Sequence, residues 1–227
     1  MSALVEDDPL MIDVVSDVVC PWCFIGKRRL EKAVAAAGTP IAIRWRPFQL
    51  DPTIPPQGKD RRVYLEQKFG SKERIRKMHE NVAAAGASEG IPFAFDRIAI
   101  SPNTINAHRL IRWAADAPSQ GRLVESLFRA YFLEGRNVGD GEVLSEIGWG
   151  HGMDRAIISA RLASDEDRDA VRAEIEDAQR IGVTGVPTFI IDRRYALVGA
   201  QPAEELVAAI RQVSAARAGN VPTAQAS

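Results

Sequence analysis

Cysteine and histidine are both scarce in this chain of 227 residues, which contains two cysteines and three histidines. A structural zinc site takes four such ligands, usually from two C-x-x-C pairs or from one pair and two closely spaced histidines. Cys20 and Cys23 form a single pair, and the histidines stand far apart in the sequence. The sequence therefore predicts no metal site, and half of a zinc site stays open as an alternative interpretation of the cysteine pair.

The chain also lacks long apolar runs and an excess of either charge. No stretch approaches the roughly 18 apolar residues of a membrane-spanning helix, and the formal net charge is −1. That balance gives no electrostatic reason to bind nucleic acid or an anionic membrane. The first residues, MSALVEDDPLM, lack the basic and apolar regions of a signal peptide. We therefore expect a cytoplasmic protein with no nucleic-acid and no membrane partner.

The sequence does contain a C-P-W-C motif at the junction of a predicted strand and a predicted helix. Cys20, Pro21, Trp22 and Cys23 follow a short apolar run. A C-x-x-C pair at such a junction is typical of a dithiol redox centre, because two thiols at this spacing can close and reopen a disulfide. In a reducing compartment that disulfide is catalytic or redox-sensing rather than structural. Two unreactive buried cysteines are the structural alternative.

The helix N-terminus sets the expected roles of the four motif residues. Unpaired backbone N–H groups and the helix dipole favour a thiolate on Cys20, which we expect to attack. Cys23 lies one turn deeper and should be less exposed, so we expect it to resolve the mixed disulfide. Pro21 suits a first helical turn, where its missing N–H costs nothing, and Trp22 adds bulk at the rim of the site.

Hydrophobic patterning predicts a core that is interrupted by a long helical segment. Strands are expected at about 10–15, 41–48, 188–191 and 195–198, and core helices at about 21–37 and 203–213. Between them, helices are expected at about 61–69, 72–85, 103–115, 122–132, 141–148, 154–163 and 165–181. This order predicts a discontinuous domain of residues 1–54 and 182–213, with a helical domain of residues 55–181 inserted into it. We expect the charged run Lys72–His79 on the surface and a disordered tail at 214–227.

A second motif lies far downstream, in the segment GVTGVPTFII that starts at Gly182. Thr188–Ile191 has the composition of a buried strand, and Pro187 at its start cannot donate a hydrogen bond to a sheet. Because Gly185 and Val186 precede it, Pro187 is a candidate for a cis peptide bond.

Both motifs resemble those of the thioredoxin superfamily and of its DsbA-like group. Together with Ser101–Leu110, the segment Ser16–Gly26 resembles the FrnE-like proteins, which are related to the 2-hydroxychromene-2-carboxylate isomerases and the kappa-class glutathione transferases. The resemblance spans residues 10–213 and implies an α/β thioredoxin-like fold with a large helical insertion domain. The isomerases and transferases have serine where Cys20 stands, which favours thiol–disulfide exchange over their chemistry.

The resemblance also implies a substrate-binding loop. In this family the proline loop lies against the cysteines, so Pro187 shapes the site. The backbone of the preceding residue, here Val186, pairs with an extended substrate or with glutathione.

Four polar residues complete the predicted site. The resemblance places Asn103, Thr104 and His108 near the cysteines as possible substrate contacts, and Asp17 stands three residues before Cys20 as a possible proton relay or loop-orienting residue. The structural alternatives are helix-start residues, a satisfied histidine and a polar turn.

We therefore expect a thiol–disulfide oxidoreductase or isomerase that needs no tightly bound cofactor and uses glutathione as a possible co-substrate. Its partner would be a thiol- or disulfide-containing protein or small molecule, and its reduction potential about −250 to −170 mV. A glutathione-dependent isomerase or transferase acting on a small aromatic or polyketide substrate is the second hypothesis. A redox-sensing or chaperone-like protein that binds a client is the third.

Overall fold

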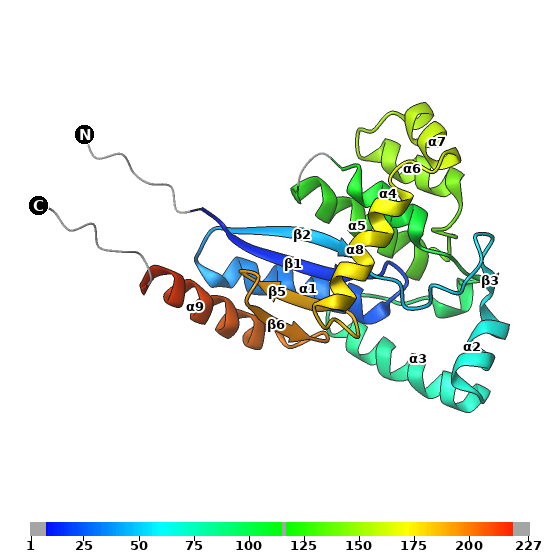
Figure 1. Ribbon diagram of the computed structural model, residues 1–227. Helices are drawn as coiled ribbons and strands as arrows, with labels where there is room; N and C mark the ends of the chain where they lie inside the picture. Colours follow the sequence, from blue (N-terminus) through cyan, green and yellow to red (C-terminus); the bar gives the residue numbers. More distant parts are fainter. Residues whose placement is uncertain (1–7, 115–116, 220–227) are drawn as a thin grey trace, which may run out of the picture.

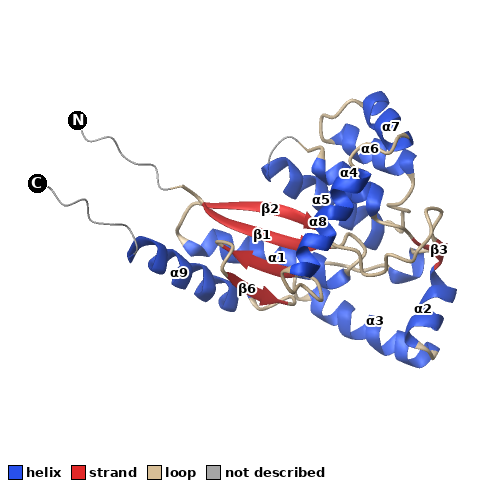
Figure 2. Ribbon diagram, in the orientation of Figure 1, coloured by secondary structure: helices blue, strands red, loops and turns tan. Residues whose placement is uncertain are grey.

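A mixed four-stranded sheet forms the centre of the protein in the computed structural model, which describes residues 8–114 and 117–219. The strands are β1 (Leu10–Ser16), β2 (Ile41–Pro47), β5 (Thr188–Ile191) and β6 (Tyr195–Val198), in the order β2-β1-β5-β6. β1 and β2 are parallel, whereas β5 runs antiparallel to both β1 and β6 (Figure 2). The sheet therefore joins segments from the two ends of the sequence.

Helix α1 (Pro21–Ala37) makes the crossover that a parallel strand pair requires between β1 and β2. It begins with a proline directly after Cys20 and ends at Gly38, whose φ of 76° is a left-handed conformation that suits glycine. Helix α9 (Ala203–Gly219) packs beside α1. These two helices and the sheet form the part of the fold on which the cysteine motif is built (Figure 1).

The segment between β2 and β5 is mainly helical and lies at the right-hand end of the sheet in Figure 1. Its helices are α2 (Arg61–Phe69), α3 (Lys72–Ala87), α4 (Ile105–Arg112), α5 (Ala117–Phe132), α6 (Gly141–Gly150), α7 (Arg155–Ala163) and α8 (Arg168–Arg180), with a 3₁₀ turn at Phe95–Arg97. Two short strands, β3 (Lys59–Asp60) and β4 (Ile100–Ser101), pair antiparallel within it. α5 and α8 pack against β2, which attaches the helical segment to the sheet.

An aromatic cluster ties α1 to the helical segment. Phe24 of α1 stacks on Phe128 of α5 with 5.1 Å between ring centroids, and both rings are fully buried. Phe93 and Phe132 meet edge to face at 5.3 Å beside them. Burying each of these rings stabilises the fold by about 2–3 kcal/mol, so α1 is held from both the sheet side and the helical side.

The sheet, α1 and α9 confirm the α/β architecture predicted from the sequence. β3, β4 and the 3₁₀ turn were not predicted, because elements of two or three residues carry no periodic pattern. The domain boundaries stay a prediction. Within the described parts of the chain, none of the helices combines the length and the apolar character needed to cross a bilayer.

One prediction about the C-terminal tail is wrong. Residues 214–219, which were expected to be disordered, continue α9 as far as Gly219. The alanines and Arg217 in this stretch have high helix propensity, which outweighs their small and polar character. The remaining residues of the predicted tail, 220–227, lie outside the described residues.

Candidate active site

Cys20 occupies the N-cap position of α1, where the chain leaves β1 and turns into the helix. Its extended backbone (φ −93°, ψ 113°) directs the carbonyl oxygen into the first turn, where it accepts from Cys23 N at 3.0 Å. Its own N–H donates to the carbonyl oxygen of Asp17 at 3.0 Å. The exposed fraction is 4% for Cys20 and 1% for Cys23, so the second cysteine is the less exposed one, as expected from its place one turn deeper.

The loop before β5 closes over the first cysteine. The Cys20 thiol donates to the carbonyl oxygen of Val186, with 3.6 Å between sulfur and oxygen. The Val186–Pro187 peptide bond is cis. Two further hydrogen bonds fix this loop, because Thr188 Oγ1 donates to the carbonyl of Gly185 at 2.7 Å and Gly199 N donates to the carbonyl of Pro187 at 2.8 Å.

The environment of the second cysteine favours its neutral thiol. Burial raises the pKa of Cys23 well above its usual value, and the neighbouring Cys20 thiol raises it further. The Ser16 hydroxyl and the backbone of Asp17 act in the opposite direction with a smaller effect. Cys23 is therefore protonated at neutral pH while Cys20 stands beside it.

Cys20 opens onto a cavity of about 330 Å³ between α1, α2, α3 and α5. This volume lies within the range of small-molecule sites, which begins at about 300 Å³. Most of its walls are apolar. The apolar side chains that line it are Val19, Pro21, Trp22, Leu50, Ile54, Leu65, Phe69, Met78, Val82, Phe95, Pro102 and Val186.

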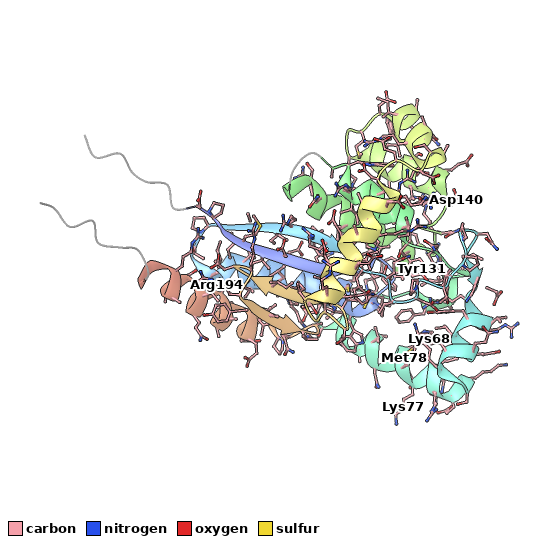
Figure 3. The ribbon with its side chains drawn as sticks, in the orientation of Figure 1. Lys68, Lys77, Met78, Tyr131, Asp140 and Arg194 are labelled. Atoms are coloured by element: carbon pink, nitrogen blue, oxygen red, sulfur yellow. The ribbon has the colours of Figure 1, made fainter. Side chains whose placement is uncertain are left out.

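A polar group of side chains stands in the same cavity. The phenol oxygen of buried Tyr131 accepts a hydrogen bond from Arg61 Nη1 at 2.9 Å, and burial raises the pKa of Tyr131 to about 12. Lys68 Nζ donates to the hydroxyl of Tyr64 at 2.8 Å. In Figure 3 Tyr131 and Lys68 approach from the two sides of this region. His79 stacks on Phe95 with 4.4 Å between ring centroids.

Several predicted site residues do meet in this cavity. Asp17, Thr104 and Trp22 line it together with Cys20. Trp22 is 40% exposed, which places it at the rim. Asp17 is 1% exposed, and one carboxylate oxygen accepts from Leu50 N at 2.8 Å, so this side chain anchors the loop after β2.

Two of the predicted substrate contacts lie outside the cavity lining. Asn103 joins two loops, because its amide nitrogen donates to the carbonyl of Ile54 at 2.7 Å and its oxygen accepts from Ile105 N at 3.1 Å. His108 is buried, and its Nε2 lies 2.9 Å from the carbonyl oxygen of Phe48. His108 lines a different cavity, of about 480 Å³, on the side of β2. The side chains of Asn103 and His108 both form hydrogen bonds within the protein.

Sequence reasoning missed the polar wall formed by Arg61, Tyr64, Lys68 and Tyr131 and placed the run Lys72–His79 on the surface. Most of that run is exposed, but Met78 and His79 at its end are partly buried and line the cavity. The available signal was amphipathic spacing, since residues 61, 64, 65 and 68 share one face of a helix. Within the described ranges, no group of three or more His, Cys, Asp or Glu side chains is placed to hold a metal ion.

Comparison with known proteins identifies a matching family and similar structures. The model of the DSBA-like thioredoxin domain matches residues 11–211. The structure resembles that of a probable DsbA oxidoreductase from Streptomyces coelicolor, with 33% sequence identity, a TM-score of 0.83 and coverage of 96% of this chain and 94% of that one. The predicted DsbA-like thioredoxin fold is thereby confirmed.

Two further comparisons have lower sequence identity. A 2-hydroxychromene-2-carboxylate isomerase matches with a TM-score of 0.70 and 17% identity, over 93% of this chain and 99% of the other. The uncharacterized protein YwbO of Bacillus subtilis (strain 168) is 29% identical over 188 residues, which are 79% of this chain and 86% of that protein. The similarity to the isomerase concerns the fold alone.

Proposed function

Because the chain belongs to the DSBA-like thioredoxin domain family, we propose that it is a FrnE-like thiol–disulfide oxidoreductase that works through Cys20 and Cys23. The observation that carries this proposal is the position of the Cys20 sulfur, at the N-terminus of α1 and in the wall of the cavity. The helix N-terminus favours a thiolate there. The buried Cys23 thiol lies within reach to complete the exchange.

The reaction takes two exchange steps. The Cys20 thiolate attacks one sulfur of a disulfide R–S–S–R′, so that a Cys20–S–S–R bond forms and R′–S⁻ leaves. Cys23 then loses its proton and attacks the Cys20 sulfur, which releases R–S⁻ and leaves a Cys20–Cys23 disulfide. Two electrons pass from the protein dithiol to the substrate, and the two released thiolates take up protons. The same steps in reverse oxidise a substrate dithiol.

The raised pKa of Cys23 favours this order of steps. Burial is the largest cause of the raised pKa, and the free Cys20 beside it raises the pKa further. Once Cys20 is bound in a mixed disulfide, the contribution of Cys20 is lost while that of burial remains. Cys23 is then easier to deprotonate than in the dithiol, which favours its attack at this stage.

We also propose that the protein acts in the cytoplasm and that glutathione regenerates it. Two glutathione thiols reduce the Cys20–Cys23 disulfide and leave as glutathione disulfide, so no tightly bound cofactor is required. A potential of about −250 to −170 mV would keep the protein mostly as a dithiol against a cytosolic glutathione pool poised at about −280 to −320 mV. Reduction or isomerisation of disulfides then fits better than their installation.

A redox titration of the pair in glutathione buffers tests the function directly. The expected result is a single two-electron transition within that range, and a value near −120 mV would instead indicate a dedicated oxidant. Cys23→Ser should trap a mixed disulfide on Cys20, visible as a mass increase by mass spectrometry. Cys20→Ser should abolish thiol exchange, and retention of exchange in this variant would rule out the assignment.

The same variants separate the alternatives. An isomerase or transferase activity on an aromatic or polyketide substrate would survive in Cys20→Ser. A client-binding protein would bind stoichiometrically and show no turnover in a dithiol assay.

A further inference from the structure

Arg61 is a cation without an acidic partner in the cavity beside Cys20. Its Nη1 donates to the hydroxyl of Tyr131, and its guanidinium lies 5.7 Å from the centre of that ring. In the part of the chain that the structure describes, no ion pair involves Arg61. Its Nε is buried and has no hydrogen-bond partner. A buried donor on a charged group is costly to leave unpaired, which points to a ligand at this place.

The acidic side chains of the cavity, Asp17 and Asp51, form no ion pair with Arg61. Asp51 Oδ1 accepts from Thr53 N at 2.9 Å and from Thr53 Oγ1 at 2.6 Å. These hydrogen bonds and the charge of Lys68 lower the pKa of Asp51, although burial opposes them. Asp17 Oδ2 accepts from Leu50 N, whereas Oδ1 is buried without a hydrogen-bond partner, 3.6 Å from His108 Nε2.

On the other side of Arg61 stand two acidic residues, and neither forms an ion pair with Arg61. Arg61 and His79 stand in a wall shared with a second hollow of about 610 Å³, which Glu66 and Glu80 also line. Glu80 pairs with Arg76, and Glu66 forms an ion pair with Arg62 at 3.5 Å, although its Oε1 accepts no hydrogen bond. Burial and the positive charge of Arg61 lower the pKa of His79, so this ring stays neutral, and its Nε2 is likewise buried without a partner.

We propose that this cavity binds a low-molecular-weight disulfide with an apolar body and one carboxylate, and that Arg61, held by Tyr131, recognises the carboxylate. This inference rests on the proposed function, because the substrate sulfur must meet Cys20. The apolar lining described above receives the body of the molecule. Guanidinium is the side chain best suited to a carboxylate, since its N–H groups match the two oxygens.

The burial of Cys20 supports a small substrate over a folded protein. Only 4% of Cys20 is exposed, and its sulfur is reached through a cavity of about 330 Å³. A disulfide on a folded surface would have to displace the walls formed by α2 and α3, whereas a small molecule fits a space of this size.

The test uses 4,4′-dithiodibenzoate, which carries one carboxylate on each half, and its dimethyl ester, in which a methyl group removes each charge. Reduced protein is mixed with each, and the second-order rate constant is measured from the absorbance of the released aryl thiol. In Arg61→Gln the acid-to-ester ratio of rate constants should fall about ten- to hundredfold, as expected for loss of a charge-assisted hydrogen bond. Arg61→Lys should retain more of the ratio than Arg61→Gln, because it keeps the charge.

The neighbouring Arg62 provides a matched control, since it is exposed and does not line this cavity. Arg62→Gln should keep the ratio within about twofold of the wild-type value, whereas Tyr131→Phe, which removes the hydroxyl that holds Arg61, should lower it several-fold. An unchanged ratio in Arg61→Gln, or an equal fall in Arg62→Gln, would overturn the inference while leaving the oxidoreductase function intact. Failure of the wild-type protein to reduce either compound or 2-hydroxyethyl disulfide would instead remove the proposed function.

Discussion

Gly26 offers a test of how closely the active-site helix must approach the Pro187 loop. A Cβ atom at this position would stand 2.9 Å from Pro187 Cγ and 3.1 Å from Phe189 Cζ. Both contacts are tighter than normal packing, and both atoms belong to buried rings that cannot swing away. Gly26→Ala should therefore force α1 and the start of β5 apart by a few tenths of an ångström.

Two opposing terms set the effect of Gly26→Ala on stability. Replacing a glycine within a helix by alanine gains up to about 1 kcal/mol, whereas overpacking a core costs about 1–3 kcal/mol. The net change should be a loss of about 0–2 kcal/mol in the free energy of unfolding. A Cβ atom added to Gly150, at the end of α6, would meet no atom within 4 Å, so Gly150→Ala shows the helix term without the clash.

The same displacement should slow thiol exchange. Val186, whose carbonyl lies 3.6 Å from the Cys20 sulfur, precedes Pro187 and would move with it. Misplacement by 1 Å can cost about a hundredfold in rate, so a few tenths of an ångström should cost several-fold. Urea denaturation and the reduction of 2-hydroxyethyl disulfide measure the two effects. If Gly26→Ala were as stable and as active as Gly150→Ala, the close packing of α1 on this loop would be refuted.

Three further outcomes follow from burial. Iodoacetamide should modify Cys20 before Cys23 in the reduced protein, because burial and the neighbouring thiol raise the pKa of Cys23; peptide mapping that finds Cys23 modified first would contradict this. Arg109→Met should lower the free energy of unfolding by about 3 kcal/mol or more, measured by urea denaturation, because fully buried Arg109 donates to carbonyls at the end of α7 and in the α7–α8 loop. The lowered pKa of His79 means that its contribution to stability is present above about pH 6.5 and is lost as the pH falls, so His79→Gln should reduce the loss of stability between pH 7 and pH 5.

The core of the fold could be predicted because its signals are local. β2 alternates apolar and polar residues, α1 lies between Pro21 and Gly38, and β5 is a short apolar run after Pro187. The cysteine motif could likewise be recognised, because its residues lie within four consecutive positions. The end of α9 was misjudged because a short alanine-rich stretch fits both a helix and a flexible tail.

The cavity could not be predicted in the same way, because its walls come together only in the folded chain. Arg61 and Tyr131 are hydrogen-bonded across 70 positions of sequence. Neither residue lies in a recognisable motif. In the sequence, Arg61 is one of several charged residues of an amphipathic helix, and nothing distinguishes it from those on the surface. Asn103 is the opposite case. It was predicted as a substrate contact from the motif around it, but its side chain forms hydrogen bonds that join two loops.

Different parts of the fold place the Cys20 sulfur and enclose the cavity beside it. The Cys20 sulfur, which we propose as the reacting atom, is placed by β1, α1 and the Pro187 loop, all of which belong to the sheet and its neighbours. The space that a substrate must enter is closed by α2, α3 and α5, whose residues supply Arg61, His79 and Tyr131. Substitutions on α2 and α3 should therefore change which disulfide reacts, while the potential of the Cys20–Cys23 pair stays set by the helix N-terminus and by the burial of Cys23. Measuring both quantities in Arg61→Gln separates the two: a changed substrate preference at an unchanged potential supports the division, and a shift of both together contradicts it.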